Sequence, residues 1–294
     1  MIRTATFADI PALTDNWKRC FGDGGDYVGF FMSRRFSPAN TLVAVESERV
    51  VSQLFLLPGH LRLAGETYDA DYLYAAATHP AYQGRGHMAR LIEAAKAHTH
   101  ARGGSFIALV PGKKGLYDYY ARFGFSQLFT YQQRVFARAE LEQIAVDHAD
   151  VRAADAPEIT ALRNEVLSAG DAFLWSEPAV RYAVAEHEAF RGRAVCVYHE
   201  GQLCAWLLAA RDGETAFVGE CCALDGAFPL AARALLDCYD AAQFTLRIPA
   251  TSDQIRPPVP SPLTPHTGMV CPLSADAATA ITRGKNPYIG LILE

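Results

Sequence analysis

Along the first half of the chain, apolar and polar residues alternate in patterns that predict a mixture of helices and strands. Apolar residues recur at helical spacing over 10–21, and the glycines that follow end this helix. A second amphipathic helix is expected from about 86 to 102, ended by Gly103-Gly104. The remaining apolar runs predict strands at 41–46, 50–57, 60–68, 71–78, 105–110 and 125–136, with a short helix at 114–122.

The second half repeats this order after a polar, helix-friendly connector at 137–150. Its opening residues, Val151-Arg152-Ala153-Ala154-Asp155-Ala156, echo residues 2–9, Ile-Arg-Thr-Ala-Thr-Phe-Ala-Asp. We predict helices at 156–168, 178–189 and 229–240, and strands at 193–199, 202–210, 216–224, 243–248, 268–273 and 288–293. The proline-rich stretch 257–265 is expected to form a stiff extended loop. The pattern therefore predicts two structurally related halves.

Composition supports two domains and narrows the class of protein. The chain has 294 residues, of which 50% are hydrophobic and 20% are charged, as in soluble globular proteins. Its net charge of −5 argues against an electrostatic nucleic-acid binder. No apolar run approaches the roughly 20 residues that span a membrane, and the N-terminus does not resemble a signal peptide. We therefore expect a cytoplasmic protein with no membrane partner.

The seven cysteines point in the same direction. None forms a Cys-x-x-Cys pair, so zinc coordination and a disulfide framework are both poorly supported. Most of them sit in apolar stretches, and we expect small buried side chains in a reducing compartment. No metal is expected.

The segment Thr78–Met88 carries the most informative pattern, because a predicted strand leads through a glycine turn into a helix. This arrangement collects free backbone N–H groups at the positive end of a helix, where a pyrophosphate can bind. Gly84 and Gly86 let the backbone approach the ligand, and Arg85 can add charge. A generic turn that opens a helix is the alternative, since the Walker pattern is absent and the dinucleotide fingerprint is incomplete.

Two segments resemble the GNAT-type N-acetyltransferase superfamily. Gln83-x-x-Gly86, within His-Pro-x-Tyr-Gln-Gly-Arg-Gly, is similar to the acetyl-CoA loop of that family, Gln/Arg-x-x-Gly-x-Gly/Ala. Met88 occupies the last position of this pattern, where the family has Gly or Ala. Bulkier residues also occur at that position in the branch of the enhanced intracellular survival acetyltransferases. Downstream, Tyr120-x-x-x-Gly124-Phe125 resembles the family's Tyr-x-x-x-Gly-Phe signature. The resemblance is strong over residues 1–136 and weak beyond, where no Gln-x-x-Gly-x-Gly equivalent follows the predicted strand 216–224.

This resemblance implies an α/β (α+β) fold of two tandem GNAT-like domains. Each would have a mixed, mostly antiparallel sheet flanked by helices. The first, residues 1–140, would bind acetyl-CoA. The second, residues 151–294, would be a degenerate copy whose last strand returns toward the active site.

The resemblance also implies a reaction mechanism. Acetyl-CoA would lie where the fourth and fifth strands splay apart, and an amine would attack the thioester directly while Tyr120 protonates the departing thiolate. Backbone groups near Ala76, Ala77 and Thr78 would bind the pantetheine arm and polarise the thioester carbonyl. The pyrophosphate would be held by N–H groups of Gln83, Gly84, Arg85, Gly86, His87 and Met88. The competing interpretation of Tyr120 is an aromatic side chain that only packs.

The sequence indicates the general base and the acceptor pocket less clearly than the acetyl-CoA site. In the survival-protein branch the C-terminal carboxylate enters the first active site, which implies Glu294 as a base; the alternative is a strand that happens to end the chain. Residues 20–31 hold two carboxylates among aromatics, which suits a cationic amine, although a flexible surface loop fits as well. We expect His79 to be structural and His87 to face solvent.

The sequence thus predicts an acetyl-CoA-dependent N-acetyltransferase that acts on a primary amine of a small molecule or peptide. A homo-oligomer is compatible with it. Two alternatives remain open: a CoA-binding or partner-binding module without catalysis, and a tandem aminoacyl transferase that uses charged tRNA. The net acidity and the lack of a basic helical arm speak against the tRNA-dependent enzyme and any nucleic-acid partner.

Overall fold

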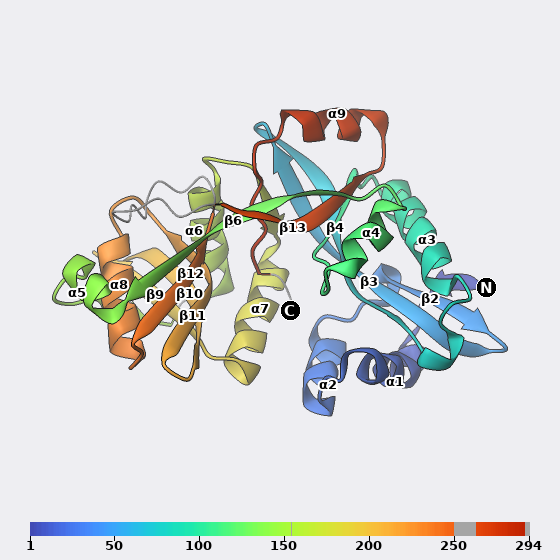
Figure 1. Ribbon diagram of the computed structural model, residues 1–294, viewed down its shortest axis with the longest axis horizontal. Helices are drawn as coiled ribbons and strands as arrows, with labels where there is room; N and C mark the ends of the chain where they lie inside the picture. The colour runs from blue at the N-terminus through green and yellow to red at the C-terminus, as the bar shows by residue number, and fades with distance from the viewer. Residues whose placement is uncertain (154, 250–262, 292–294) are drawn as a thin grey trace. The chain divides into compact units, whose positions relative to one another are not determined.

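The computed structural model describes residues 1–153, 155–249 and 263–291, and the chain divides into two compact units (Figure 1). The first unit comprises Met1–Leu61, Thr67–Gln127 and Gly268–Arg283. The second comprises the described residues of Arg62–Glu66, Leu128–Thr267 and Gly284–Glu294. Each unit contains its own series of neighbouring strands, covered by helices.

The sheet of the first unit has the strand order β1-β2-β3-β4-β5-β13. Antiparallel pairing joins β1 to β2, β2 to β3 and β5 to β13, whereas β4 and β5 are parallel. The strands are β1 (Ile2–Thr4), β2 (Thr41–Glu46), β3 (Arg49–Leu63), β4 (Glu66–Thr78), β5 (Phe106–Leu109) and β13 (Leu263–Pro272).

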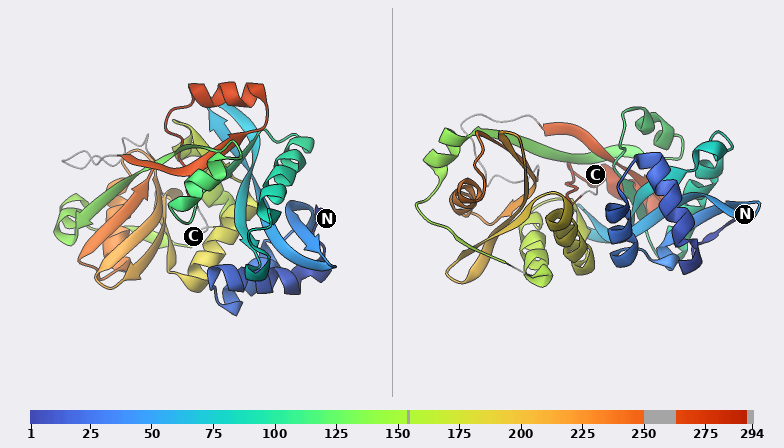
Figure 2. Two further views of the ribbon diagram at one scale, coloured as in Figure 1. Left: turned by 45° about the vertical axis from the view of Figure 1, so that its right-hand side comes forward. Right: turned by 90° about the horizontal axis from the view of Figure 1, so that it is seen from below.

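Helices cover both faces of this sheet (Figures 1 and 2). Successive side chains of a strand point to opposite faces, so Leu54 of β3 packs in the core with α3 while its neighbour Phe55 contacts Trp17 of α1. On the apolar face of α3, Leu91, Ile92 and Ala95 are completely buried. The helices are α1 (Ile10–Phe21), α2 (Gly25–Arg34), α3 (His87–Ala101), α4 (Gly115–Ala121) and α9 (Ala275–Arg283), with 3₁₀ turns η1 (Phe7–Asp9), η2 (Pro38–Asn40) and η3 (Pro80–Tyr82).

The second unit repeats this architecture. Its sheet has the order β6-β12-β11-β10-β9-β7, and α8 connects the parallel strands β11 and β12 as α3 connects β4 and β5. Its elements are β6 (Ser126–Ala137), α5 (Arg138–Ile144), β7 (Asp150–Arg152), α6 (Ala156–Leu167), β8 (Ala172–Trp175), α7 (Glu177–Phe190), β9 (Arg193–His199), β10 (Gln202–Asp212), β11 (Thr215–Ala223), α8 (Phe228–Cys238) and β12 (Gln243–Ile248). The repeat predicted from the sequence is present in the fold.

The two halves of the chain exchange one strand. In the first unit β13 pairs antiparallel with β5, with Met269 opposite Leu109. In the second unit β6 pairs antiparallel with β12, with Phe136 opposite Phe244. The strand after β12 thus completes the first sheet, and the strand after β5 completes the second. The two compact units therefore do not follow the expected limits of 1–140 and 151–294, because each unit includes a strand from the other half of the chain.

Several elements differ from those expected. The strands expected at 60–68 and 71–78 are parts of two long strands, β3 and β4, which reverse at Ala64-Gly65, where φ is 51° and 85°. The helix α9 and the strand β8 were not predicted. In place of the strand expected at 288–293, Tyr288 forms isolated bridges with Thr130 and Ala172, and residues 292–294 lie outside the described chain. Residues 257–262 of the proline-rich stretch also lie outside the described chain.

Candidate active site

The C-terminal end of β4 extends beyond its pairing with β5. The parallel register runs from Ala70 opposite Phe106 to Tyr72 opposite Ala108, whereas β4 continues to Thr78. Ala75 has a φ of 44°, a left-handed conformation that a non-glycine residue rarely adopts and that interrupts a regular strand. Residues 76–78 therefore lie past the last pair with β5. The predicted pantetheine site requires such a strand edge.

Hydrogen bonds from β3 fix this strand end. The buried Ser52 hydroxyl donates to the carbonyl of Ala77 at 3.0 Å and lies 2.8 Å from Thr78 Oγ1. One residue further, the amide of His79 donates to the carbonyl of Val51 at 2.9 Å. The His79 ring accepts from the amide of Ala81 at 3.2 Å, so its expected structural role is confirmed. Both the strand end and the turn that follows are thus held by local contacts.

The turn between β4 and α3 has the conformation that its two glycines permit. Gly84 and Gly86 have φ values of 75° and 74°, and Gly86 caps the N-terminus of α3. Residues 83–86 are exposed. The first amides of a helix lack partners within the helix, and its dipole makes this end positive. The turn can therefore bind an anion such as a pyrophosphate.

Gln83 closes this turn onto the strand. Its side-chain Nε2 donates to the carbonyl of Thr78 at 3.1 Å, and the Cys20 thiol of α1 lies 3.2 Å from the same oxygen. A glutamine at this position therefore ties the start of the turn to the end of β4.

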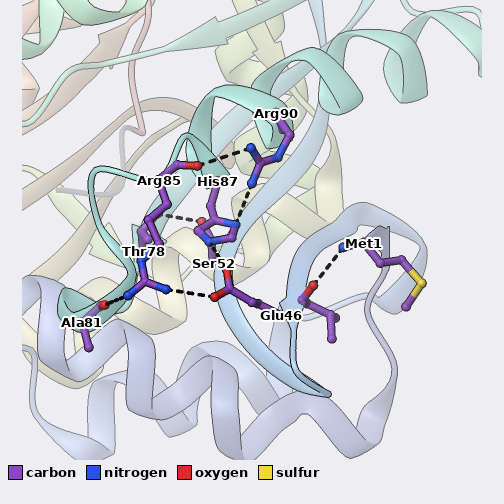
Figure 3. Close-up of polar contacts among 9 residues, drawn as sticks. Met1, Glu46, Ser52, Thr78, Ala81, Arg85, His87 and Arg90 are labelled. Atoms are coloured by element: carbon purple, nitrogen blue, oxygen red, sulfur yellow. Dashed lines mark hydrogen bonds and ion pairs between the residues drawn. The ribbon is translucent and has the colours of Figure 1, made fainter.

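Three side chains of the turn and helix make contacts with one another and with β2 (Figure 3). Arg85 Nη1 lies 2.9 Å from Glu46 Oε1, and its Nη2 donates to the carbonyl of Ala81 at 3.1 Å. His87 Nε2 lies 2.8 Å from Glu46 Oε2, and Arg90 lies 3.0 Å from His87 Nδ1. The expectation that His87 faces solvent is wrong, because only 6% of the residue is exposed. Its partner Glu46 comes from a distant strand, which no local pattern indicates.

Tyr120 is buried in the core of the first unit. Only 8% of it is exposed, and its ring packs edge-on against Phe125 and Tyr119 at centroid distances of 5.7 and 5.5 Å. Burial, with a smaller contribution from Tyr119, raises the pKa of the Tyr120 hydroxyl to about 12. The hydroxyl is therefore protonated at neutral pH and can act as a proton donor. The flanking Tyr117 and Tyr119 are only partly buried.

Residues 20–31 are mostly helical rather than a loop, because α1 ends at Phe21 and α2 begins at Gly25. Asp23, between the helices, accepts a hydrogen bond from the indole of Trp17 at 2.7 Å. The hydroxyls of Tyr27 and Tyr74 lie 3.1 Å apart, and Tyr74 directly precedes the irregular Ala75. The aromatic rings of Tyr27 and Trp17 thus lie beside Tyr74 of β4, and Asp23 is held against Trp17.

The C-terminal residue Glu294 lies outside the described residues. The chain just before it is fixed within the second unit. Phe173 donates its amide to the carbonyl of Tyr288 at 2.8 Å, and the indole of Trp175 donates to the carbonyl of Gly290 at 2.8 Å.

Sequence reasoning missed Glu46, Ser52 and Tyr74, which lie on three neighbouring strands. Strand alternation places such residues on one face or the other, but it does not indicate which side chains reach the turn. Within 1–153, 155–249 and 263–291, no group of three or more His, Cys, Asp or Glu side chains is placed to hold a metal ion. Of the helices described, none is long and apolar enough to cross a membrane.

Comparison with known proteins identifies the first unit's fold. Residues 1–128 match the acetyltransferase (GNAT) domain family. No curated protein matches the chain.

Several solved structures share the fold over most of the chain. A GCN5-related N-acetyltransferase from Anabaena variabilis ATCC 29413 is 13% identical, with a TM-score of 0.78 over 95% of this chain and 74% of that one. A probable N-acyltransferase from Enterococcus faecalis V583 is 14% identical, with a TM-score of 0.76 over 94% and 73%. Eis1 from Mycobacterium abscessus is 14% identical, with a TM-score of 0.71 over 95% and 75%. At such identities the likeness concerns the fold.

Proposed function

We propose that this protein, whose residues 1–128 match the acetyltransferase (GNAT) domain family, moves an acetyl group from acetyl-CoA to a primary amine of a small molecule or peptide. The observation that carries the proposal is the exposed turn 83–86, with Gly84 and Gly86 in left-handed conformations at the start of α3. It lies next to a strand end that runs past its partner.

In the proposed complex the backbone of the first unit holds the cosubstrate. The strand edge at Ala76, Ala77 and Thr78 pairs with the pantetheine arm. The amides of residues 83–88, that is Gln83, Gly84, Arg85, Gly86, His87 and Met88, bind the pyrophosphate at the helix terminus. The Arg85 guanidinium already pairs with Glu46, so the amides supply most of the anion binding. The proposed reaction uses no metal.

The proposed reaction is a direct acyl transfer. A neutral amine attacks the thioester carbonyl, so that a C–N bond forms and the C–S bond breaks. Tyr120 gives its proton to the departing CoA sulfur and recovers one from the ammonium that the attack produces. This buried hydroxyl is protonated at neutral pH and can donate its proton to the sulfur as the thiolate develops. Proton donation makes the sulfur a better leaving group.

The acceptor that suits this site is a cationic amine. Asp23 accepts a hydrogen bond from Trp17, whose ring contacts Tyr27 and Tyr74, so one carboxylate lies beside this aromatic cluster. Asp26, in the first turn of α2, is a second carboxylate of the same segment. Carboxylates attract an ammonium group, and ring faces stabilise it further. The amine then loses its proton before it attacks.

The proposed general base is the C-terminal carboxylate at Glu294, which is supported by the resemblance to the survival-protein branch. Deleting Glu294 should lower kcat by roughly 10²-fold at neutral pH, the usual contribution of a general base. The loss should shrink at high pH, where the amine needs no base. A C-terminal tag should have a similar effect, and pH profiles of thiol release measure both. Turnover equal to wild type at every pH would remove the carboxylate from the mechanism.

Gly86→Val is expected to abolish acetyl-CoA binding. The φ of 74° is strained for a β-branched residue, and a new Cβ would lie 3.4 Å from Arg90 Nη1. Acetyl-CoA at 100 times its Kd should stabilise the wild-type protein by about 2.7 kcal/mol in a thermal-shift measurement. The variant should show no such shift.

Gly103→Val is the matched control, because Gly103 has a φ of 88° at the other end of α3 and open space around it. It carries the same kind of backbone strain but should keep the acetyl-CoA shift. No shift for the wild-type protein, or equal shifts for both variants, would contradict the proposed binding site.

A further inference from the structure

A closed ring of polar contacts surrounds the glycine turn (Figure 3). Glu46, the last residue of β2, contacts Arg85 through Oε1 and His87 through Oε2, at 2.9 and 2.8 Å. Arg90 completes the ring, since its guanidinium donates to the carbonyl of Arg85 at 3.3 Å and lies 3.0 Å from His87 Nδ1. One carboxylate from β2 therefore holds both sides of Gly86.

The ring also fixes the orientation of the imidazole. An arginine can only donate a hydrogen bond, so His87 Nδ1 accepts from Arg90 and the ring proton lies on Nε2, which faces Glu46. His87 is 6% exposed and the Glu46 side chain 37%, so the Glu46–His87 contact is shielded from water on the histidine side. The hydrogen bond that Arg85 Nη1 donates to Glu46 is charge-assisted, and such bonds are stronger than those between neutral groups.

The glycines make this support necessary. Glycine has more backbone freedom to lose than any other residue, so a turn with two glycines in left-handed conformations is costly to order. Ordering it before the ligand arrives removes that cost from binding. Arg85 makes two further contacts that restrain the turn. It donates a hydrogen bond to the carbonyl of Ala81, and its guanidinium carbon lies 5.0 Å from the centre of the Tyr82 ring in a cation–π contact.

We propose that Glu46 is a positioning residue that orders the phosphate-binding turn by holding Arg85 and His87 against the end of β2. The expected effect on acetyl-CoA affinity rests on the proposed function. The ordering of the turn does not, because it concerns the protein without ligand. Glu46 belongs to neither of the two segments that resemble the family.

When Glu46 is neutralised, the change in charge and the loss of ordering have opposite effects on the affinity for acetyl-CoA. Loss of a negative charge beside the turn favours an anionic ligand. Loss of the contacts disorders the turn and weakens binding. Glu48→Gln separates the two effects, because Glu48 is an exposed residue of the β2–β3 turn and its neutralisation changes the formal charge equally.

The test compares Glu46→Gln, Glu48→Gln and wild type in the full chain. Amide hydrogen exchange of residues 84–88 without ligand should be about ten-fold faster in Glu46→Gln only, as the loss of a charge-assisted contact implies. The Kd for acetyl-CoA should rise about ten-fold in the same variant. The KM for acetyl-pantetheine, which lacks the phosphates, should not change.

Unchanged exchange in Glu46→Gln, or an equal change in Glu48→Gln, would overturn the positioning role. An equal loss of acetyl-CoA and acetyl-pantetheine would overturn it too, because a general structural defect would then explain both. If exchange responds as expected while wild type does not bind acetyl-CoA, the positioning role stands and the proposed function fails.

Discussion

Tyr120→Phe is expected to lower kcat by about 10²- to 10⁴-fold, the usual contribution of a general acid. The KM for acetyl-CoA should stay near wild type, because the ring that packs against Phe125 is kept. Only the proton donor is removed, so the thiolate must leave unprotonated. Steady-state thiol release with a primary amine measures both constants.

Tyr119→Phe is the matched control. Tyr119 neighbours Tyr120 on α4 and is partly exposed. The control variant also removes one tyrosine hydroxyl, but it leaves the proposed acid, Tyr120, intact. Its turnover should remain close to wild type. Wild-type turnover in Tyr120→Phe would leave Tyr120 with a packing role alone.

The pKa of Tyr120 also fixes the sign of two pH effects. Because burial raises it to about 12, deprotonation of this residue should cause no loss of kcat below about pH 11. The folded-state pKa lies above the ordinary value of 10, so its contribution to stability is complete below pH 10 and is lost as pH rises toward 12.

Arg163→Met is expected to destabilise the second unit by about 3–5 kcal/mol. Arg163 of α6 and Glu220 of β11 are 0% and 1% exposed, and Arg163 Nε lies 3.0 Å from Glu220 Oε1. Burial raises the pKa of Glu220, which Arg163 opposes by favouring the ionised carboxylate. Without Arg163 the carboxylate is buried with no counter-charge. Urea unfolding measures the loss.

The double variant Arg163→Met/Glu220→Leu should recover much of this loss, because two apolar side chains can replace a buried ion pair at little cost. Arg181→Met is the surface control, since Arg181 pairs with Glu177 on the exposed side of α7. That change should cost about 0.5 kcal/mol or less. Equal effects for Arg163→Met and Arg181→Met would show that the buried pair is not important for stability.

Local patterns predicted most elements because they depend on neighbouring residues. The helices at 10–21 and 86–102 correspond to α1 and α3, whose apolar faces repeat with the helical period. The strand at 41–46 coincides with β2, and the turn at 78–88 joins β4 to α3. The two glycines of this turn have left-handed conformations, which glycine adopts without strain.

Long-range pairing could not be predicted in this way. Nothing in the apolar run of 268–273 indicates that it pairs with β5 and not with the preceding β12. The length of the β3–β4 hairpin depends on Ala64, a non-glycine residue with a φ of 51°. Likewise, Glu46 was not recognised because it reaches the turn only after β2 takes its place in the sheet.

Amide hydrogen exchange of the wild-type chain, with and without saturating acetyl-CoA, tests most directly whether the first unit's turn binds the cosubstrate. We expect slower exchange at residues 83–88 and at 76–78 when acetyl-CoA is present. The corresponding turn of the second unit, between β11 and α8 at 224–227, should not change. No protection at 83–88, or protection confined to 224–227, would contradict the proposed site.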